Sequence, residues 1–128
     1  MKLFIVLTAL MLVGCSSYLS PEETVNRNVV ACMEGDASTR WALLSKGAQE
    51  KMLKKNPKHK ILDRFSKEAW MYKIIQSWET EIIEEKENSV KLKFKYKYQD
   101  PHSLSKKVVN ASDDITLVKE EGLWKISD

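Results

Sequence analysis

The sequence predicts an α+β domain, in which N-terminal helices pack on an antiparallel sheet of four to five strands, behind a segment that directs export. Three observations predict this order. The first fourteen of the 128 residues are almost entirely apolar. Apolar residues then recur with a helical period up to residue 56, and from residue 78 the period is two, as in strands. The composition, 43% hydrophobic and 30% charged, excludes a disordered chain and a polytopic membrane protein.

The N-terminal segment has the features of a signal peptide. Lys2 precedes an apolar run over residues 3–13 that only Thr8 interrupts. This run is too short to span a bilayer as a helix, which takes about 20 residues, and its length is typical of a signal peptide. Gly14 supplies the small residue before a cleavage site, so we expect cleavage between Gly14 and Cys15 and removal of residues 1–14.

The sequence Leu12-Val13-Gly14-Cys15 resembles the lipobox of bacterial lipoproteins. The resemblance implies that Cys15 carries a diacylglyceryl group and an acylated amino group, typically palmitate, and that residues 15–19 form a tether. Two or more acyl chains anchor a protein stably to a membrane. Ser16 follows the cysteine in place of Asp, which implies the outer membrane, facing the periplasm, in a Gram-negative source. In a Gram-positive source the anchor implies the outer face of the cytoplasmic membrane. The alternative is an ordinary secretory signal with a coincidental cysteine.

Three helices are predicted between residues 20 and 56. Each begins after a residue whose side chain can cap a helix, namely Ser20, Asp36 and Ser45. Pro21 and Glu23 strengthen the first start, because proline suits the first helical position and Glu23 completes a capping box. The expected ends are Gly35 for the first helix and Asn56-Pro57 for the third.

A basic segment follows the second predicted helix. Six lysines and His59 lie between residues 46 and 60, against one acidic residue, Glu50. This segment is either a solvated helix face followed by a loop after Pro57, or a patch that meets anionic lipid headgroups or cell-wall polymer. Beyond it, Ser66 is expected to cap a short helix that runs to Trp70.

The strongest strand signal is a hairpin over residues 78–98. Apolar residues alternate mainly with Glu before a turn at residues 87–89 and with Lys after it. An even-sum register, with Glu81 opposite Lys95 and Trp78 opposite Tyr98, places the charges on one face and the apolar side chains on the other.

The remaining strands are expected at residues 106–111, 115–119 and 123–126. Asp113-Asp114 is expected to form an exposed bend between two of them, since it gives only a weak metal-binding signal. Cys32 falls on an apolar helical stripe. It is expected to be a buried, inert thiol, and the alternative is a reactive or intermolecular one.

The order of three helices followed by an antiparallel sheet is similar to the nuclear-transport-factor-2-like (NTF2-like) superfamily, and most of all to its small bacterial lipoproteins, whose domain is uncharacterised. The resemblance implies a cone over residues 20–128, with a curved sheet wrapped around helices and a cavity between them. The superfamily includes both enzymes and binding modules, so the fold does not give the function. The motifs that carry the resemblance are Ser20-Pro21-Glu22-Glu23-Thr24-Val25, Glu34-Gly35-Asp36, Leu43-Leu44-Ser45, and residues 117–126 with Glu121-Gly122 and Trp124.

Catalytic members of this superfamily use a carboxylate in the cavity, often with a His or Arg partner. Here His59 and His102 follow prolines outside the periodic apolar faces, and Glu84 is expected at a solvated rim. We therefore expect no His or Asp in the cavity, and the sequence carries no motif for a metal or a cofactor. The expected lining is aromatic: Trp41, Trp78, Tyr96, Tyr98 and Trp124.

Two functions follow from these observations. The favoured one is a non-catalytic, membrane-anchored envelope module that binds a partner protein, a polymer or a small ligand. The alternative is a small pocket enzyme of the isomerase or dehydratase type. A formal net charge of +3 is too small to indicate nucleic acid as a partner.

Overall fold

The computed structural model describes residues 19–127. The expected signal peptide, its cleavage between Gly14 and Cys15, and lipid attachment at Cys15 lie outside the described residues. No helix in the described part of the chain is long and apolar enough to cross a membrane.

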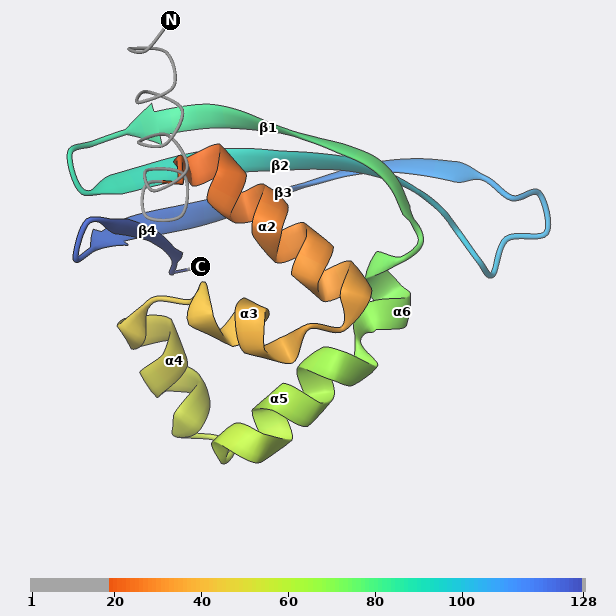
Figure 1. The fold of residues 1–128 in the computed structure, drawn as a ribbon. Helices are drawn as coiled ribbons and strands as arrows, with labels where there is room; N and C mark the ends of the chain where they lie inside the picture. The colour runs from red at the N-terminus through yellow and green to blue at the C-terminus, as the bar shows by residue number, and fades with distance from the viewer. Residues whose placement is uncertain (1–18, 128) are drawn as a thin grey trace, which may run out of the picture.

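Five helical segments lie on one side of a curved, four-stranded antiparallel sheet (Figure 1). The strands follow chain order, β1-β2-β3-β4, and α2 crosses the face of the sheet that the helices cover (Figure 1). The helices are α2 (Pro21–Glu34), α3 (Ala37–Ala42), α4 (Lys46–Leu53), α5 (Lys58–Lys67) and α6 (Ala69–Tyr72). The strands are β1 (Ile75–Glu85), β2 (Ser89–Gln99), β3 (Val108–Glu120) and β4 (Leu123–Ile126).

The predicted caps of α2 are confirmed. The Ser20 hydroxyl accepts a hydrogen bond from the Glu23 amide at 3.1 Å, and the Glu23 carboxylate accepts one from the Ser20 amide at 3.4 Å. Gly35 ends the helix with a φ of 71°. A Cβ atom at this position would lie 3.3 Å from the Ser66 carbonyl oxygen, so both the backbone angle and the close approach of α5 favour glycine.

The predicted caps of α3 and α4 are confirmed as well. The Asp36 carboxylate accepts hydrogen bonds from Thr39, which hold the pKa of Asp36 below its ordinary value. The Ser45 hydroxyl accepts a hydrogen bond from the Ala48 amide at 3.1 Å. Ser45 is buried, and its own amide donates to the Ile126 carbonyl at 2.8 Å, which fixes the start of α4 against β4.

The segment after Pro57 differs from the prediction. Helix α5 begins at Lys58 without a side-chain cap, so the basic segment that was expected to continue as a loop is partly helical. Ser66 lies inside α5 and caps no helix, and its hydroxyl donates to the Gly35 carbonyl at 3.3 Å. The helix buries Ile61 and Phe65, which lie one turn apart. Tertiary burial therefore stabilises α5 where the local sequence gives no start signal.

Strand β3 is continuous where two strands and a bend were predicted. It pairs with β2 over the full length of β2, from Ser89 opposite Val118 to Gln99 opposite Val108. Asp113-Asp114 lies within this strand, and its two side chains point to opposite faces of the sheet because strand residues alternate. The unbroken partner strand pairs with β3 from Val108 to Val118, which outweighs the low strand preference of aspartate.

The β1–β2 hairpin has the predicted faces but not the predicted register. Glu81 lies opposite Lys93 and Trp78 lies opposite Tyr96, two residues away from the predicted partners. Up to Ile82 the parity is unchanged, so Glu79 and Glu81 share the outer face with lysines of β2. Beyond Ile82 the parity reverses, and Glu85 lies opposite Val90. The connection is residues 86–88, one residue earlier than expected, and a register shift lies between Ile82 and Glu84. These two features move the pairing.

The core lies between α2 and the middle of the sheet. Val25 and Val29 of α2 pack on alternate residues of the central strands, which face the helices. Burial of these side chains, at about 25 cal/mol per Å² of apolar surface, holds the helical layer on the sheet. The other buried residues of this cluster are Val90, Leu92, Phe94, Leu117 and Ile126.

Candidate ligand-binding site

A groove of about 460 Å³ lies between α6 and the face of β2 and β3 that the helices cover. One wall comes from α6 and the residues that follow it, and Trp70 and Met71 are well exposed there, at 63% and 49%. The wall also includes Tyr72, Ile74 and Ile75. An apolar, partly exposed wall of this kind suits the body of a small ligand.

The floor of the groove is a row of aromatic rings on β2. Phe94, Tyr96 and Tyr98 occupy alternate positions, so their side chains point to the same face. The rings of Phe94 and Tyr96 are stacked at 5.2 Å between centroids, and those of Tyr96 and Tyr98 at 6.0 Å. The stacked row gives the groove an aromatic floor, which suits an apolar or aromatic group.

Asp113 supplies a carboxylate beside this floor. It lies directly opposite Phe94 in β3 and therefore shares the inner face with the aromatic row. Burial, the negative charge of Asp113 and a hydrogen bond to Asp113 together raise the pKa of the Tyr96 hydroxyl. Tyr96 thus stays protonated beside the Asp113 carboxylate, which is exposed and can accept hydrogen bonds from a ligand.

The loop between β2 and β3 completes the polar end. The Asp100 carboxylate accepts a hydrogen bond from the His102 amide at 2.9 Å, and the Asp100 amide donates to the Lys107 carbonyl at 3.0 Å. These bonds set the loop so that Asp100, Pro101 and His102 line the groove. Among the described residues that line it, two are carboxylates and none is Lys or Arg. The groove is therefore acidic and aromatic.

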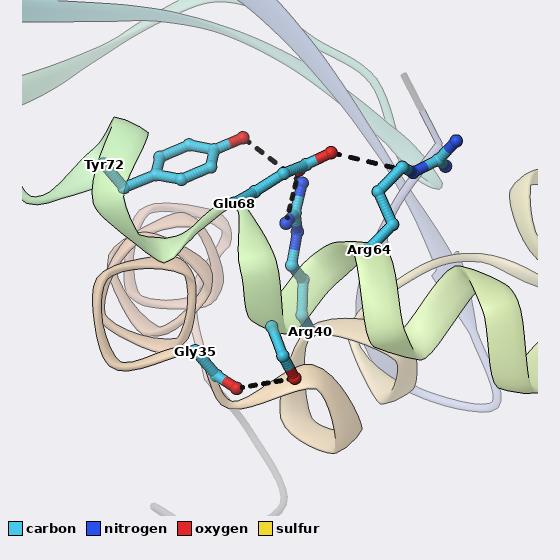
Figure 2. A network of polar contacts seen from close by, with 6 residues as sticks. Gly35, Arg40, Arg64, Glu68 and Tyr72 are labelled. Atoms are coloured by element: carbon cyan, nitrogen blue, oxygen red, sulfur yellow. Dashed lines mark hydrogen bonds and ion pairs between the residues drawn. The ribbon is translucent and has the colours of Figure 1, made fainter.

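Arg40 holds the α6 wall in place, as Figure 2 shows. Its guanidinium donates to Glu68 Oε2 at 3.0 Å and to the Tyr72 hydroxyl oxygen at 3.2 Å. It also lies over the Phe65 ring, 4.0 Å from the centroid. The side chains of Arg40 and Glu68 are 15% and 26% exposed, so this pair is largely removed from solvent. The network joins α3 to α5 and α6.

Cys32 lies behind Tyr72 and does not reach the groove. The residue is buried, which confirms the expected position of the thiol in the helical layer. Burial raises the pKa of the Cys32 thiol, and this outweighs the opposing effects of the Arg40 charge and the Tyr72 hydroxyl. A neutral buried thiol is a poor nucleophile.

The aromatic residues predicted to line a cavity lie in three places. Tyr96 and Tyr98 form the groove floor, and Trp78 lies next to it, opposite Tyr96, with its Nε1 donating to Asn26 at 3.0 Å. Trp124 lies on β4, under the ammonium of Lys119, and Trp41 lies in α3, near Lys58. Sequence reasoning missed Trp70, because α6 is too short to show a helical period.

The expectation that no His or Asp lines the cavity is wrong. Asp100, His102 and Asp113 all line the groove, because β3 is continuous and the loop after β2 reaches its mouth. Asp113 and His102 are exposed, however, and Asp100 is half-buried. Glu84 is exposed near the hairpin loop, as expected for a rim residue, and pairs with Lys86 at 3.4 Å.

The acidic end of the groove raises the question of a metal ion. Within residues 19–127, no three side chains of the types His, Cys, Asp and Glu lie close enough together to hold a metal ion. In the described part of the chain, the polar end of the groove is therefore a set of hydrogen-bond acceptors without an assembled metal site.

Two solved structures have a similar fold. A protein from Campylobacter jejuni described as an NTF2-like transpeptidase aligns with a TM-score of 0.56 and 16% identity, over 85% of this chain and 99% of that one. A SEC-C motif-containing protein from Psychrobacter arcticus aligns with a TM-score of 0.53 and 12% identity, over 85% of this chain and 59% of that one. No protein-family model and no curated protein matches the sequence. The predicted NTF2-like fold is thereby confirmed, and at these identities the likeness extends to the fold alone.

Proposed function

We propose that this protein is a lipid-anchored bacterial envelope lipoprotein, and that its NTF2-like domain is a non-catalytic module that binds a small amphipathic ligand in the groove beside α6. The ligand would carry an apolar or aromatic body and a cationic or hydrogen-bond-donating end. The anchor is supported by the lipobox-like sequence that ends at Cys15.

The observation that carries the proposal is the pairing of an aromatic floor with Asp113. Stacked rings bind a flat or apolar body, and the carboxylate beside them attracts a positive group at one end. Asp100 adds a second negative charge at the same end. An amine next to an aromatic ring fits both parts, whereas a carboxylate ligand would meet two like charges.

The second candidate is a small pocket enzyme, which the presence of Asp113, Tyr96 and His102 in one groove favours. A general base needs a pKa tuned by a dry environment, and Asp113 and His102 are exposed. We therefore expect no turnover of ketosteroid-, dehydratase- or epoxide-type substrates. Turnover that is lost in Asp113→Asn would support the enzyme instead.

The binding module is tested with 2-phenylethylamine as the probe and 3-phenylpropionate as its anionic counterpart. Binding to the purified full chain is followed by tryptophan fluorescence, since Trp70 lines the groove. Asp113→Asn should weaken amine binding about tenfold, because a hydrogen bond to a charged group contributes about 1.5 kcal/mol or more. The control is Asp114→Asn, which removes the same charge from the outer face, where Asp114 pairs with Lys91 at 3.7 Å.

Equal losses in the two variants, or equal binding of the two probes, would refute the groove as a site for a cationic ligand. The comparison is sharp because the two aspartates are adjacent in one strand and differ only in the face they occupy. An effect of net charge alone would not distinguish them.

The anchor is tested separately with labelled fatty acid in the producing cells. Cys15→Ser should abolish labelling and release the protein from the membrane fraction, because the anchor requires the thiol. Cys32→Ser should leave both unchanged, since Cys32 is buried in the folded domain. Full labelling of Cys15→Ser would exclude this lipid anchor and leave the groove proposal untouched.

A further inference from the structure

A second hollow of about 440 Å³ lies beside α4. Figure 1 shows α4 and α6 at opposite ends of the helical layer. Its floor is aliphatic, formed by Leu44, Ala48, Met52 and Ile126. Its rim is polar and basic, formed by Lys51, Lys55, Asn56 and Arg64. The basic segment noted in the sequence thus borders a shaped site and not only a solvated helix face.

The rim charges are incompletely neutralised. No described residue forms an ion pair with Lys51 or Lys55, and no Asp or Glu among the described residues lines the hollow. Arg64 has one acidic neighbour, Glu68, at 3.6 Å from its Nε, and Figure 2 shows the rest of its guanidinium pointing away from that carboxylate. Glu68 is shared with Arg40, so one negative charge faces two arginines.

We infer that this hollow binds the headgroup of an anionic phospholipid in the membrane that holds the protein. The phosphate would pair with Lys51, Lys55 and Arg64, and the adjoining glycerol and first acyl carbons would cover the aliphatic floor. The combination selects an amphipathic anion, because a free anion leaves the floor exposed and a neutral lipid leaves the cations unpaired.

The position of the hollow agrees with this source. Ile126 and Ser127, at the end of β4, border the hollow, and the preceding residues of β4 border a small depression that also contains Leu19. Leu19, the first described residue, therefore lies beside the same strand. The chain from Cys15 to Leu19 spans about 15 Å at most, so an anchor at Cys15 would hold Leu19 within about that distance of the bilayer surface. The choice of the membrane as the source rests on the proposed lipid anchor.

The test uses the full, lipid-modified chain on vesicles of phosphatidylcholine, with or without one-fifth phosphatidylglycerol. Flotation with the phosphatidylcholine vesicles first shows whether the lipid anchor attaches the protein to a membrane that contains no anionic lipid. Amine acetylation is then followed lysine by lysine by mass spectrometry. Lys51 and Lys55 should react about fivefold more slowly on the anionic vesicles, whereas Lys54 and Lys60, which do not line the hollow, serve as internal controls and should change little.

A pair of variants tests the aliphatic floor. Met52→Ser should remove most of the selective protection, because it takes an apolar side chain out of the floor. The matched control is Leu53→Ser, which changes an exposed neighbour on the same helix and should keep the protection. Thermal unfolding of both variants is measured to check that the domain is still folded.

Three results would overturn the inference. Equal protection of all lysines in residues 46–60 would indicate diffuse attraction to a charged surface. The same protection by soluble glycerol 3-phosphate or poly(glycerol phosphate) on neutral vesicles would assign the hollow to a free anion or a wall polymer. Flotation without selective protection would leave the anchor in place and exclude the lipid site.

Discussion

The groove beside α6 and the hollow beside α4 differ in charge, in floor and in how their walls are held. The groove combines aspartates with aromatic rings, whereas the hollow combines lysines and an arginine with aliphatic side chains. The groove wall is held by Arg40, which reaches residues 28 and 32 positions further along the chain. The hollow wall is formed largely by α4, and the start of α4 is held by a local cap, in which the Ser45 hydroxyl accepts a hydrogen bond from the Ala48 amide.

This difference shows that one small fold can provide two binding chemistries of opposite sign. The sign is set by a few residues at each end of the helical layer, and the sheet and α2 between them form a common support. A wall held by long-range contacts depends on the whole fold, and a wall held by a local cap depends mainly on its own helix. The following substitutions separate the two cases.

The largest effect is expected for Arg40→Ala. It removes two hydrogen bonds and the contact with Phe65, and it leaves Glu68 partly buried without its closest partner. Breaking a buried pair on one side costs about 3 kcal/mol in the free energy of unfolding. Urea unfolding should show this loss, and 2-phenylethylamine binding in the groove should weaken.

Arg64→Ala is the matched control for Arg40→Ala. The Arg64 side chain is 53% exposed, so its removal should cost less than about 1 kcal/mol. It should weaken lipid protection in the hollow and leave the groove intact. Similar losses of stability for the two arginines would show that the groove wall is not specially dependent on Arg40.

An intermediate effect is expected for Ser45→Ala. Loss of the cap leaves the Ala48 amide without its acceptor and should lower the free energy of unfolding by about 1 kcal/mol. The control is Ser38→Ala in α3, an exposed position, which should change stability by less than about 0.5 kcal/mol. An unchanged stability of Ser45→Ala would mean that contacts with β4, and not the cap, hold α4.

The smallest effect is expected from the Cys32 thiol and appears only at alkaline pH. Burial raises the folded-state pKa of Cys32 above its unfolded value, so the folded state holds the proton more tightly. The resulting stability is complete below the unfolded pKa, about 8.5, and is lost as the pH rises toward the folded pKa. Unfolding temperatures measured from about pH 7.5 to about pH 9.5 should fall, and Cys32→Ala should reduce the slope.

Cys32 also reports on the groove wall, because Tyr72 lies between the thiol and the groove. Iodoacetamide should label native Cys32 much more slowly than the unfolded protein, and Arg40→Ala should speed the labelling. Rapid labelling of the native wild type would contradict a closed α2–α6 contact.

The sequence predicted the parts of the fold that depend on local chemistry. Ser20, Asp36 and Ser45 each cap a helix as expected, and Gly35 ends one, because these signals act within a turn of the residue. The alternation of Glu and Lys in the hairpin gave the correct faces up to Ile82, beyond which the parity reverses. It did not give the register, because a shift of two residues preserves every face and only the loop and the bulge decide between registers.

For the candidate site, the sequence correctly placed Tyr96 and Tyr98 on the inner face of the sheet, since alternation along β2 suffices for this. It did not place Asp113, because the unbroken pairing of β3 with β2 overrides the local preference of two aspartates for a bend. It gave no indication of Arg40, whose partners are distant in the chain.

By itself, then, the sequence determined the helix caps, most of the strand faces and the order of helices and sheet, because each depends on neighbours within a few residues. The tertiary structure alone decided that α5 is a helix, that Asp113 enters the groove, and that Arg40 joins three helices. Each of these depends on burial or pairing between segments that meet only in the folded chain. Such contacts have no local pattern from which they can be read.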